Sequence, residues 1–212
     1  MRFTDLGLVG YDEGLAFQRS AHERVSGGGE AEFILCSHRP VITLGRHTPR
    51  SDVKTGEDAL ARAGIALRRA DRGGQATYHG PGQQMVYAVC DLRRSGRDLH
   101  RFLRALESVV IGALEDLGVR AVSRPGLTGA WTGERKISSI GIGVRGWVSY
   151  HGIALNVDSD DLSRFLLLRP CGMDIEMTCA EKELGRPVDR YELKETIKRR
   201  IQHDQSRLAG TG

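Results

Sequence analysis

Residues 72–83 restrict the local structure of this chain more than any other stretch. They read Arg-Gly-Gly-Gln-Ala-Thr-Tyr-His-Gly-Pro-Gly-Gln, with four glycines, one proline and one histidine in the run. Glycine weakens helices and strands, but it permits positive φ and lets the backbone approach a ligand closely. The composition therefore predicts a loop between regular elements. Because loops of this kind carry function more often than stability, we expect this one to wrap a ligand.

The size and charge of the chain indicate a cytoplasmic globular protein. Its 212 residues suffice for one domain with a sizeable core, so we treat residues 1–212 as a single catalytic domain. No basic segment followed by an apolar one opens the sequence, and no apolar run reaches the ~20 residues that cross a bilayer. We therefore expect no membrane partner.

The net charge of +4 has two interpretations. Basic clusters near residues 68–72, 93–97 and 194–200 fit solvated helix faces. They also fit a docking surface for an acidic partner. Nucleic acid is a poorer candidate, because aromatic residues make up 6% of the chain and none interleave the basic runs.

The four cysteines are Cys36, Cys90, Cys171 and Cys179. None forms a Cys-x-x-Cys pair, and no His/Cys cluster has the spacing of a zinc site, so we expect no metal. Cytosolic cysteines are usually free thiols. A free thiol is most often a small buried hydrophobic group, and a catalytic role needs further evidence.

The remaining segments mix helix and strand patterns without strict βαβ order, which favours an α+β fold over a doubly wound α/β fold. The strongest helix follows Asp98, a good N-cap, and its apolar residues repeat at i, i+3, i+4 and i+7 until Gly118 ends it. Further helices are predicted at residues 11–25, 57–63, 159–167 and along a final stripe of Leu193, Ile197 and Ile201. Strands are predicted at residues 33–36, 41–44, 65–68, 85–90, 140–144, 147 or 148 to 150, and 153–157.

Two capping boxes are predicted near the end of the chain. Thr178 and Glu181 have the required spacing, as do Asp189 and Glu192. Each pair predicts the start of a helix.

Residues 141–146 match the pattern G-x-G-x-x-G. A dinucleotide-binding loop of this pattern has to open a helix after a strand, whereas strand-like residues follow here. We interpret the glycines as a strand against which a ligand or another backbone lies closely. Arg145 and Gly146 then form a hairpin turn.

The best candidate nucleophile is Cys171, because proline precedes it and glycine follows it. A cysteine nucleophile reacts as the thiolate, which a nearby cation favours. Lys136 can supply that cation, since it enters an apolar run after a turn and can point into a cleft; an exposed turn lysine is the simpler alternative. His79 and His151 both precede glycine and can act as hydrogen-bond donors or bases, or as structural histidines.

Together these motifs resemble one family. The run at 72–83 resembles the signature of lipoate–protein ligase B, the octanoyl-[acyl-carrier-protein]:protein N-octanoyltransferases. The blocks at residues 40–46, 136–141, 151–157 and 170–172 resemble the other blocks of that family, in the same order.

The resemblance implies a fold like the catalytic domain of biotin and lipoate protein ligases, and it implies roles for individual residues. Cys171 is expected to carry the acyl group as a thioester, and Lys136 to lower the pKa of Cys171 and to shuttle protons. The acyl site is expected to be lined by Arg72, Gly73, Gly74, Gln75, Ala76, Thr77, Tyr78, His79, Ser139, Ile140, Gly141, Gly152, Ile153 and Ala154.

The implied reaction needs no cofactor. Octanoyl-acyl carrier protein is the expected donor, and lipoyl domains of 2-oxoacid dehydrogenase E2 subunits and glycine-cleavage H protein are the expected acceptors. Exchange between thioesters is roughly isoenergetic and the final amide is more stable, so the transfer requires no ATP.

Three alternatives remain open at this level. An ATP-dependent lipoate or biotin ligase of the same fold would not need Cys171 and would release AMP. A non-catalytic binder of acyl carrier protein or lipoyl domains would not need the Lys136–Cys171 pair. A nucleic-acid binder is suggested by charge alone.

Overall fold

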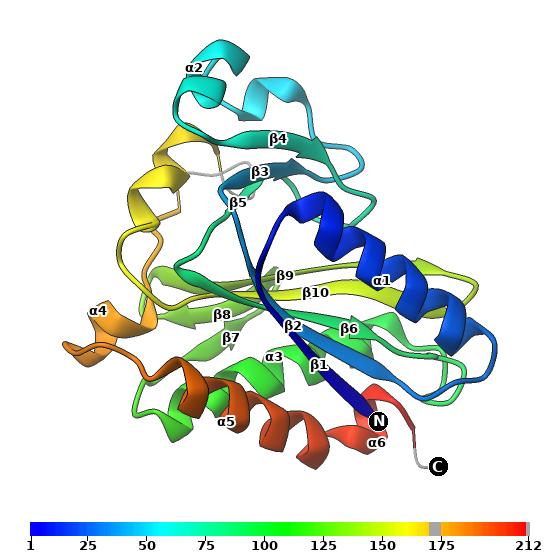
Figure 1. The fold of residues 1–212 in the computed structure, drawn as a ribbon. Coiled ribbons are helices and arrows are strands. Elements are labelled where there is room, and N and C mark those ends of the chain that lie inside the picture. Colours follow the sequence, from blue (N-terminus) through cyan, green and yellow to red (C-terminus); the bar gives the residue numbers. More distant parts are fainter. Residues whose placement is uncertain (170–174, 211–212) are drawn as a thin grey trace.

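The strands form two sheets in the computed structural model, which describes residues 1–169 and 175–210 (Figure 1). The larger sheet has seven described strands, in the order β1 (Arg2–Val9), β2 (Glu32–His38), β6 (Gln83–Val89), β10 (Val148–Asn156), β9 (Arg135–Arg145), β8 (Leu127–Thr132) and β7 (Val122–Arg124). The smaller sheet has the order β4 (Ala66–Arg69), β3 (Val41–Leu44) and β5 (Thr77–His79). Parallel pairs (β1 with β2, β3 with β4) occur beside antiparallel ones, so the predicted α+β class is confirmed.

Helices cover both faces of the larger sheet (Figure 1). α1 (Tyr11–Ser26) packs on one face, and α3 (Leu99–Asp116), α5 (Arg190–His203) and α6 (Gln205–Leu208) pack on the other. The shorter helices are α2 (Glu57–Arg62), α4 (Ala180–Leu184), and the 3₁₀ helices η1 (Arg50–Asp52) and η2 (Leu162–Leu167). None of the described helices is both long and apolar enough to cross a membrane.

The predicted N-caps of the two long helices on the second face are confirmed. The Asp98 carboxylate accepts the backbone N–H of Arg101 at 2.9 Å, and α3 then buries its apolar stripe against the sheet. Asp189 likewise accepts the N–H groups of Tyr191 and Glu192 at 2.8 and 3.1 Å. Each cap satisfies helix donors that have no partner within the helix.

Four strands were not predicted: β1, β5, β7 and β8. β1 and β7 form the two edges of the larger sheet and are largely exposed, so their sequences lack the alternation of a half-buried strand. β8 contains Gly129, a residue type that is depleted in strands.

The prediction of an uninterrupted loop at residues 72–83 is wrong for its second half. Thr77–His79 form β5, which pairs with β3, and β6 already begins at Gln83. β3 supplies the backbone hydrogen bonds that outweigh the weak strand propensity of this run. Only residues 72–76 and the Gly80–Gly82 turn remain irregular.

The expectation of two separate strands after the hairpin differs from the structure. The strands predicted before and after residue 151 are one strand, β10, because His151 keeps its pairing with Ile142 although its φ is +61°. The hairpin is confirmed, but its turn residues are Gly146 and Trp147, both at positive φ, because Arg145 still pairs with Val148.

The capping box at the start of α4 is wrong. Cys179 occupies the N-cap position without a side-chain hydrogen bond. The Thr178 hydroxyl instead donates to Glu183, and Glu181 accepts from Ser159. Tertiary contacts of both side chains replace the local reciprocal bonds.

Candidate functional site

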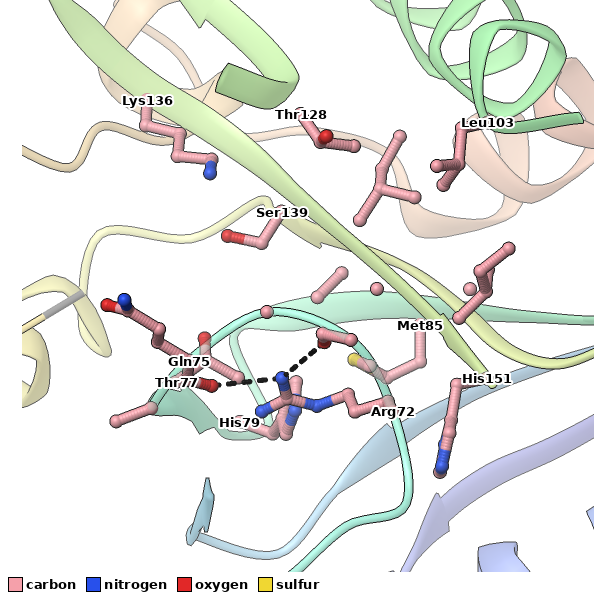
Figure 2. Close-up of a pocket in the computed structure, with 18 of the residues that line it drawn as sticks. Arg72, Gln75, Thr77, His79, Met85, Leu103, Thr128, Lys136, Ser139 and His151 are labelled. Atoms are coloured by element: carbon pink, nitrogen blue, oxygen red, sulfur yellow. Dashed lines mark hydrogen bonds between the residues drawn. The ribbon is translucent and has the colours of Figure 1, made fainter. Parts of the chain in front are cut away.

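The loop at residues 72–76 faces the larger sheet across a pocket of about 430 Å³ (Figure 2). Strands β5, β6, β9 and β10 contribute to the walls, together with Tyr11 of α1 and Leu103 of α3. Met85, Leu103, Leu127 and Ile140 make much of the lining apolar. A mostly apolar pocket with a few polar groups suits an aliphatic chain with one reactive end.

The structure brings Lys136 and nearly all of the predicted acyl-site residues to this pocket. They are Arg72, Gly73, Gly74, Gln75, Ala76, Thr77, His79, Ser139, Ile140, Gly141, Gly152 and Ala154. Tyr78 and Ile153 do not line it. Alternate residues of a strand point to opposite faces, so each is turned away from neighbours that do line it. The Tyr78 hydroxyl donates to Asp161 at 2.8 Å, and Ile153 packs in the core cluster that includes the apolar stripe of α3.

Arg72 ties the loop to the smaller sheet. Its guanidinium donates to the carbonyls of Gly73 and Gln75 within the loop, at 3.1 and 2.9 Å. It also donates to the carbonyl and hydroxyl oxygens of Thr43 on β3, at 3.1 and 2.7 Å. Arg72 is 8% exposed, so these bonds lie in a mostly buried environment. The buried Arg72 guanidinium therefore fixes the conformation of the loop.

The glycine pattern at residues 141–146 has the predicted structural use. The Gly73 N–H donates to the Ile142 carbonyl at 2.9 Å, which lays the loop backbone on β9. A Cβ atom on Gly141 would lie 2.9 Å from the Gly73 carbonyl oxygen, and one on Gly143 would lie 2.4 Å from the Asp71 carbonyl oxygen. Glycine is needed at both positions because another backbone lies against them.

Lys136 lies near the start of β9 and is 3% exposed. Figure 2 shows its side chain at one side of the pocket and His151 at the other. The Lys136 backbone is hydrogen-bonded to residues 176–178, which are distant in the sequence. The Lys136 N–H donates to the Glu176 carbonyl at 2.9 Å, and the Thr178 N–H donates to the Lys136 carbonyl at 3.0 Å.

Cys171 lies outside the described residues. Met177, six residues later in the sequence, pairs with Lys136 as an isolated parallel bridge. Residues 176–178, a few positions after Cys171 in the sequence, therefore lie beside Lys136.

The other three cysteines are poorly suited to nucleophilic chemistry. Cys36, Cys90 and Cys179 are all buried free thiols. Burial raises the pKa of Cys36 to about 12 and also raises the pKa values of Cys90 and Cys179. A thiol that stays protonated is a weak nucleophile.

The two pocket histidines are neutral at physiological pH. Burial lowers the pKa of His151 to about 3, and burial also holds the pKa of His79 well below its ordinary value. His79 lies within hydrogen-bond distance of Thr43 and Gln83, at 3.3 and 3.2 Å. Among the described side chains that line the pocket, His151 Nε2 and the Tyr11 hydroxyl are buried without a hydrogen-bond partner.

Sequence reasoning missed a buried polar relay behind the pocket. Gln83 donates to Asn156 at 2.8 Å, and Asn156 donates to the Thr178 carbonyl at 2.9 Å. This relay connects the Gly80–Gly82 turn to the segment that follows Cys171. No residue pattern could have revealed it, because the three partners come from distant strands and a connecting segment. No group of three or more metal-ligating side chains occurs among the described residues.

Solved structures share this fold. An ATP-bound lipoate-protein ligase A superposes with a TM-score of 0.80 at 18% identity, covering 96% of this chain and 85% of that chain. A structure from the analysis of an archaeal lipoylation system, a bi-partite lipoate protein ligase and its E2 lipoyl domain from Thermoplasma acidophilum, gives a TM-score of 0.70 at 20% identity, covering 96% of this chain and 83% of that chain. These likenesses establish the fold of a lipoate protein ligase.

Sequence comparisons identify the activity. Residues 10–202 match the model of the lipoyl protein ligase A/B catalytic domain. An octanoyltransferase of Geobacter sp. (strain M21) is 45% identical over 199 residues, which cover 93% of this chain and 94% of that protein. The chain therefore belongs to the lipoyl protein ligase A/B family, and within it to the octanoyltransferases of protein lipoylation.

Proposed function

We propose that this octanoyltransferase carries the acyl group on Cys171 as a thioester, with Lys136 as its proton-transfer partner. The observation that carries the proposal is the position of Lys136. It lies buried beside an apolar pocket, and its backbone is hydrogen-bonded to the segment that follows Cys171. Residues 1–212 would act as one catalytic domain.

The chemistry proceeds in two transfers. The Cys171 thiolate attacks the acyl thioester carbonyl, the donor thiolate leaves, and it takes a proton from the Lys136 ammonium. The amine of the acceptor lysine then attacks the new thioester, Cys171 leaves as a thiolate, and Lys136 takes the proton that the amine loses. Lys136 thus returns to its starting state. The positive charge of Lys136 favours the thiolate of Cys171 before the first transfer and again once the second transfer is complete.

The octanoyl or lipoyl chain occupies the pocket between the loop and the larger sheet. The proposed contacts are the predicted residues that line it, from Arg72 to Thr77, His79, Ser139 to Gly141, Gly152 and Ala154. Leu103, Leu127 and Met85 add apolar surface that the family resemblance did not include. Burial of the aliphatic chain contributes about 0.8 kcal/mol for each CH₂ group.

A lipoyl domain is the proposed acceptor, and octanoyl-acyl carrier protein is the proposed donor. The Thermoplasma ligase of similar fold belongs to a lipoylation system that includes its E2 lipoyl domain, which supports an acceptor of this kind. The finer candidates are E2 subunits of 2-oxoacid dehydrogenases and glycine-cleavage H protein. A net charge of +4 favours an acidic donor protein.

One experiment separates this mechanism from that of an ATP-dependent ligase. The protein is incubated with octanoyl-acyl carrier protein and weighed intact by mass spectrometry. We expect an octanoyl adduct that is absent in Cys171→Ser and much reduced in Lys136→Ala, with Cys179→Ser as the matched control that keeps it. A wild-type protein without an adduct, or an adduct that survives in Cys171→Ser, would contradict the proposal.

A further inference from the structure

Trp131 and Lys136 form a buried cross-strand pair beside the pocket. Trp131 of β8 lies directly opposite Lys136 of β9 in the strand register. The two residues are 2% and 3% exposed. The Lys136 ammonium nitrogen lies 5.3 Å from the centre of the Trp131 ring, within the range of a cation–π interaction. Tryptophan is the best aromatic partner for a cation.

An irregularity in the strand pairing creates this pair. Ala130 pairs with Ser138, and the next residue of β8, Trp131, pairs with Lys136. β9 therefore contains one extra residue, Ile137, as in a β-bulge. Regular alternation would put Ile137 and Ile140 on opposite faces of the sheet and Lys136 on the face of Ile140, yet Ile137 and Ile140 pack in the same core cluster. The extra residue instead brings Lys136 to the pocket and to Trp131.

The Trp131 ring is itself held from two sides. Its indole N–H donates to the Leu127 carbonyl at 3.1 Å. The Arg124 guanidinium of β7 lies 5.0 Å from the ring centre and pairs with Glu134. The ring is thus fixed before any substrate binds.

Gly129 leaves room for the lysine beside this ring. A Cβ atom on Gly129 would lie 2.8 Å from Lys136 Cε and 2.2 Å from the Ser138 carbonyl oxygen. Its N–H donates to the buried Glu107 carboxylate of α3 at 3.0 Å, which anchors this part of β8.

We propose that Trp131 is a positioning residue, whose ring face holds the Lys136 ammonium at the pocket by a cation–π interaction. The inference rests on the role proposed for Lys136 and extends it to a residue of the neighbouring strand. Trp131 does not line the pocket, so it acts through Lys136 and not on the substrate.

Fluorinated tryptophan tests the inference without changing the shape of the site much. Fluorine withdraws electron density from the indole face and progressively weakens its attraction for a cation. The chain has two tryptophans, so Trp147→Phe leaves Trp131 as the single labelled site. In that background we would measure the rate of octanoyl-adduct formation with unsubstituted, monofluoro-, difluoro- and tetrafluorotryptophan. We expect the logarithm of the rate to fall with each step, by about 10-fold in total.

Two variants complete the test. Trp131→Phe should retain more of the rate than Trp131→Leu, because phenylalanine keeps a weaker π face. The fluorinated proteins should keep the thermal stability and the KM for octanoyl-acyl carrier protein of the unlabelled protein, so the effect falls on kcat.

The possible outcomes separate the two proposals. A wild-type protein that forms no adduct overturns the mechanism proposed for Cys171 and Lys136. An adduct that depends on Lys136 but forms at the same rate across the fluorinated series overturns the role of Trp131 alone. A rate that falls only together with thermal stability also overturns it, because packing then explains the loss.

Discussion

Replacing Arg72 with methionine should weaken the whole fold, and not only ligand binding. Methionine keeps an unbranched apolar stem of similar reach but removes the guanidinium. That group makes four hydrogen bonds, to the carbonyls of Gly73 and Gln75 and to two oxygens of Thr43. All four acceptors then need new partners in a mostly buried environment.

The expected loss is about 3 kcal/mol in the free energy of unfolding. A hydrogen bond to a charged group contributes about 1.5–3 kcal/mol, and four bonds of one side chain do not add independently. We therefore take the equivalent of one to two such bonds. For a chain of this size, each kcal/mol shifts Tm by about 2–4 °C, so Tm should fall by about 6–12 °C.

Urea denaturation followed by circular dichroism measures this loss directly, with the m-value showing whether the unfolding transition stays comparable. Arg46→Met is the matched control. Arg46 forms an ion pair with Asp71 near the same loop, but both side chains are more than half exposed, so its loss should be small. If Arg72→Met destabilises the protein no more than Arg46→Met, the buried anchoring of the loop is refuted.

Three further predictions concern other parts of the site. Gly129→Ala should lower Tm and slow adduct formation, because its Cβ would meet Ser138 and Lys136, whereas Gly64→Ala, at φ +68° with open space and outside the pocket, should affect only Tm; equal adduct rates in the two variants would contradict this. Because the pKa of His151 is about 3 when folded and about 6.5 when unfolded, the unfolded chain takes up this proton first as pH falls. His151 therefore makes the protein lose stability as pH falls from about 6.5 to about 3, with a slope of about 1.4 kcal/mol per pH unit. Urea titrations at several pH values should show that His151→Gly removes this slope, whereas the control Trp147→Gly, also at a residue with positive φ, retains it. A disulfide thiol reagent should titrate one cysteine in the native protein and four in guanidinium, since Cys36, Cys90 and Cys179 are buried; two or more fast-reacting native thiols would contradict this.

Local patterns predicted the elements that carry strong caps and stripes. α3 and α5 follow from Asp98, Asp189 and the spacing of their apolar residues, because these features act within one element. The edge strands β1 and β7 could not be predicted, since they face solvent and owe their conformation to one neighbouring strand.

The site shows the same division between local and distant causes. The glycine run at 72–83 predicted a ligand-facing segment, but not that β3 would pair with residues 77–79 and turn Tyr78 away from the pocket. Lys136 was identified from its place at the start of an apolar strand. The extra residue at Ile137 that directs it, and the opposing Trp131, depend on how β8 pairs with β9, which no single segment encodes.

Transfer without nucleotide tests the central claim most directly. The protein is incubated with octanoyl-acyl carrier protein and an E2 lipoyl domain after enzymatic removal of ATP, and the lipoyl domain is weighed by mass spectrometry. The proposed mechanism predicts an octanoylated lipoyl domain with wild-type protein and none with Cys171→Ser. Octanoylation that occurs only with free octanoate and ATP, accompanied by release of AMP, would contradict it.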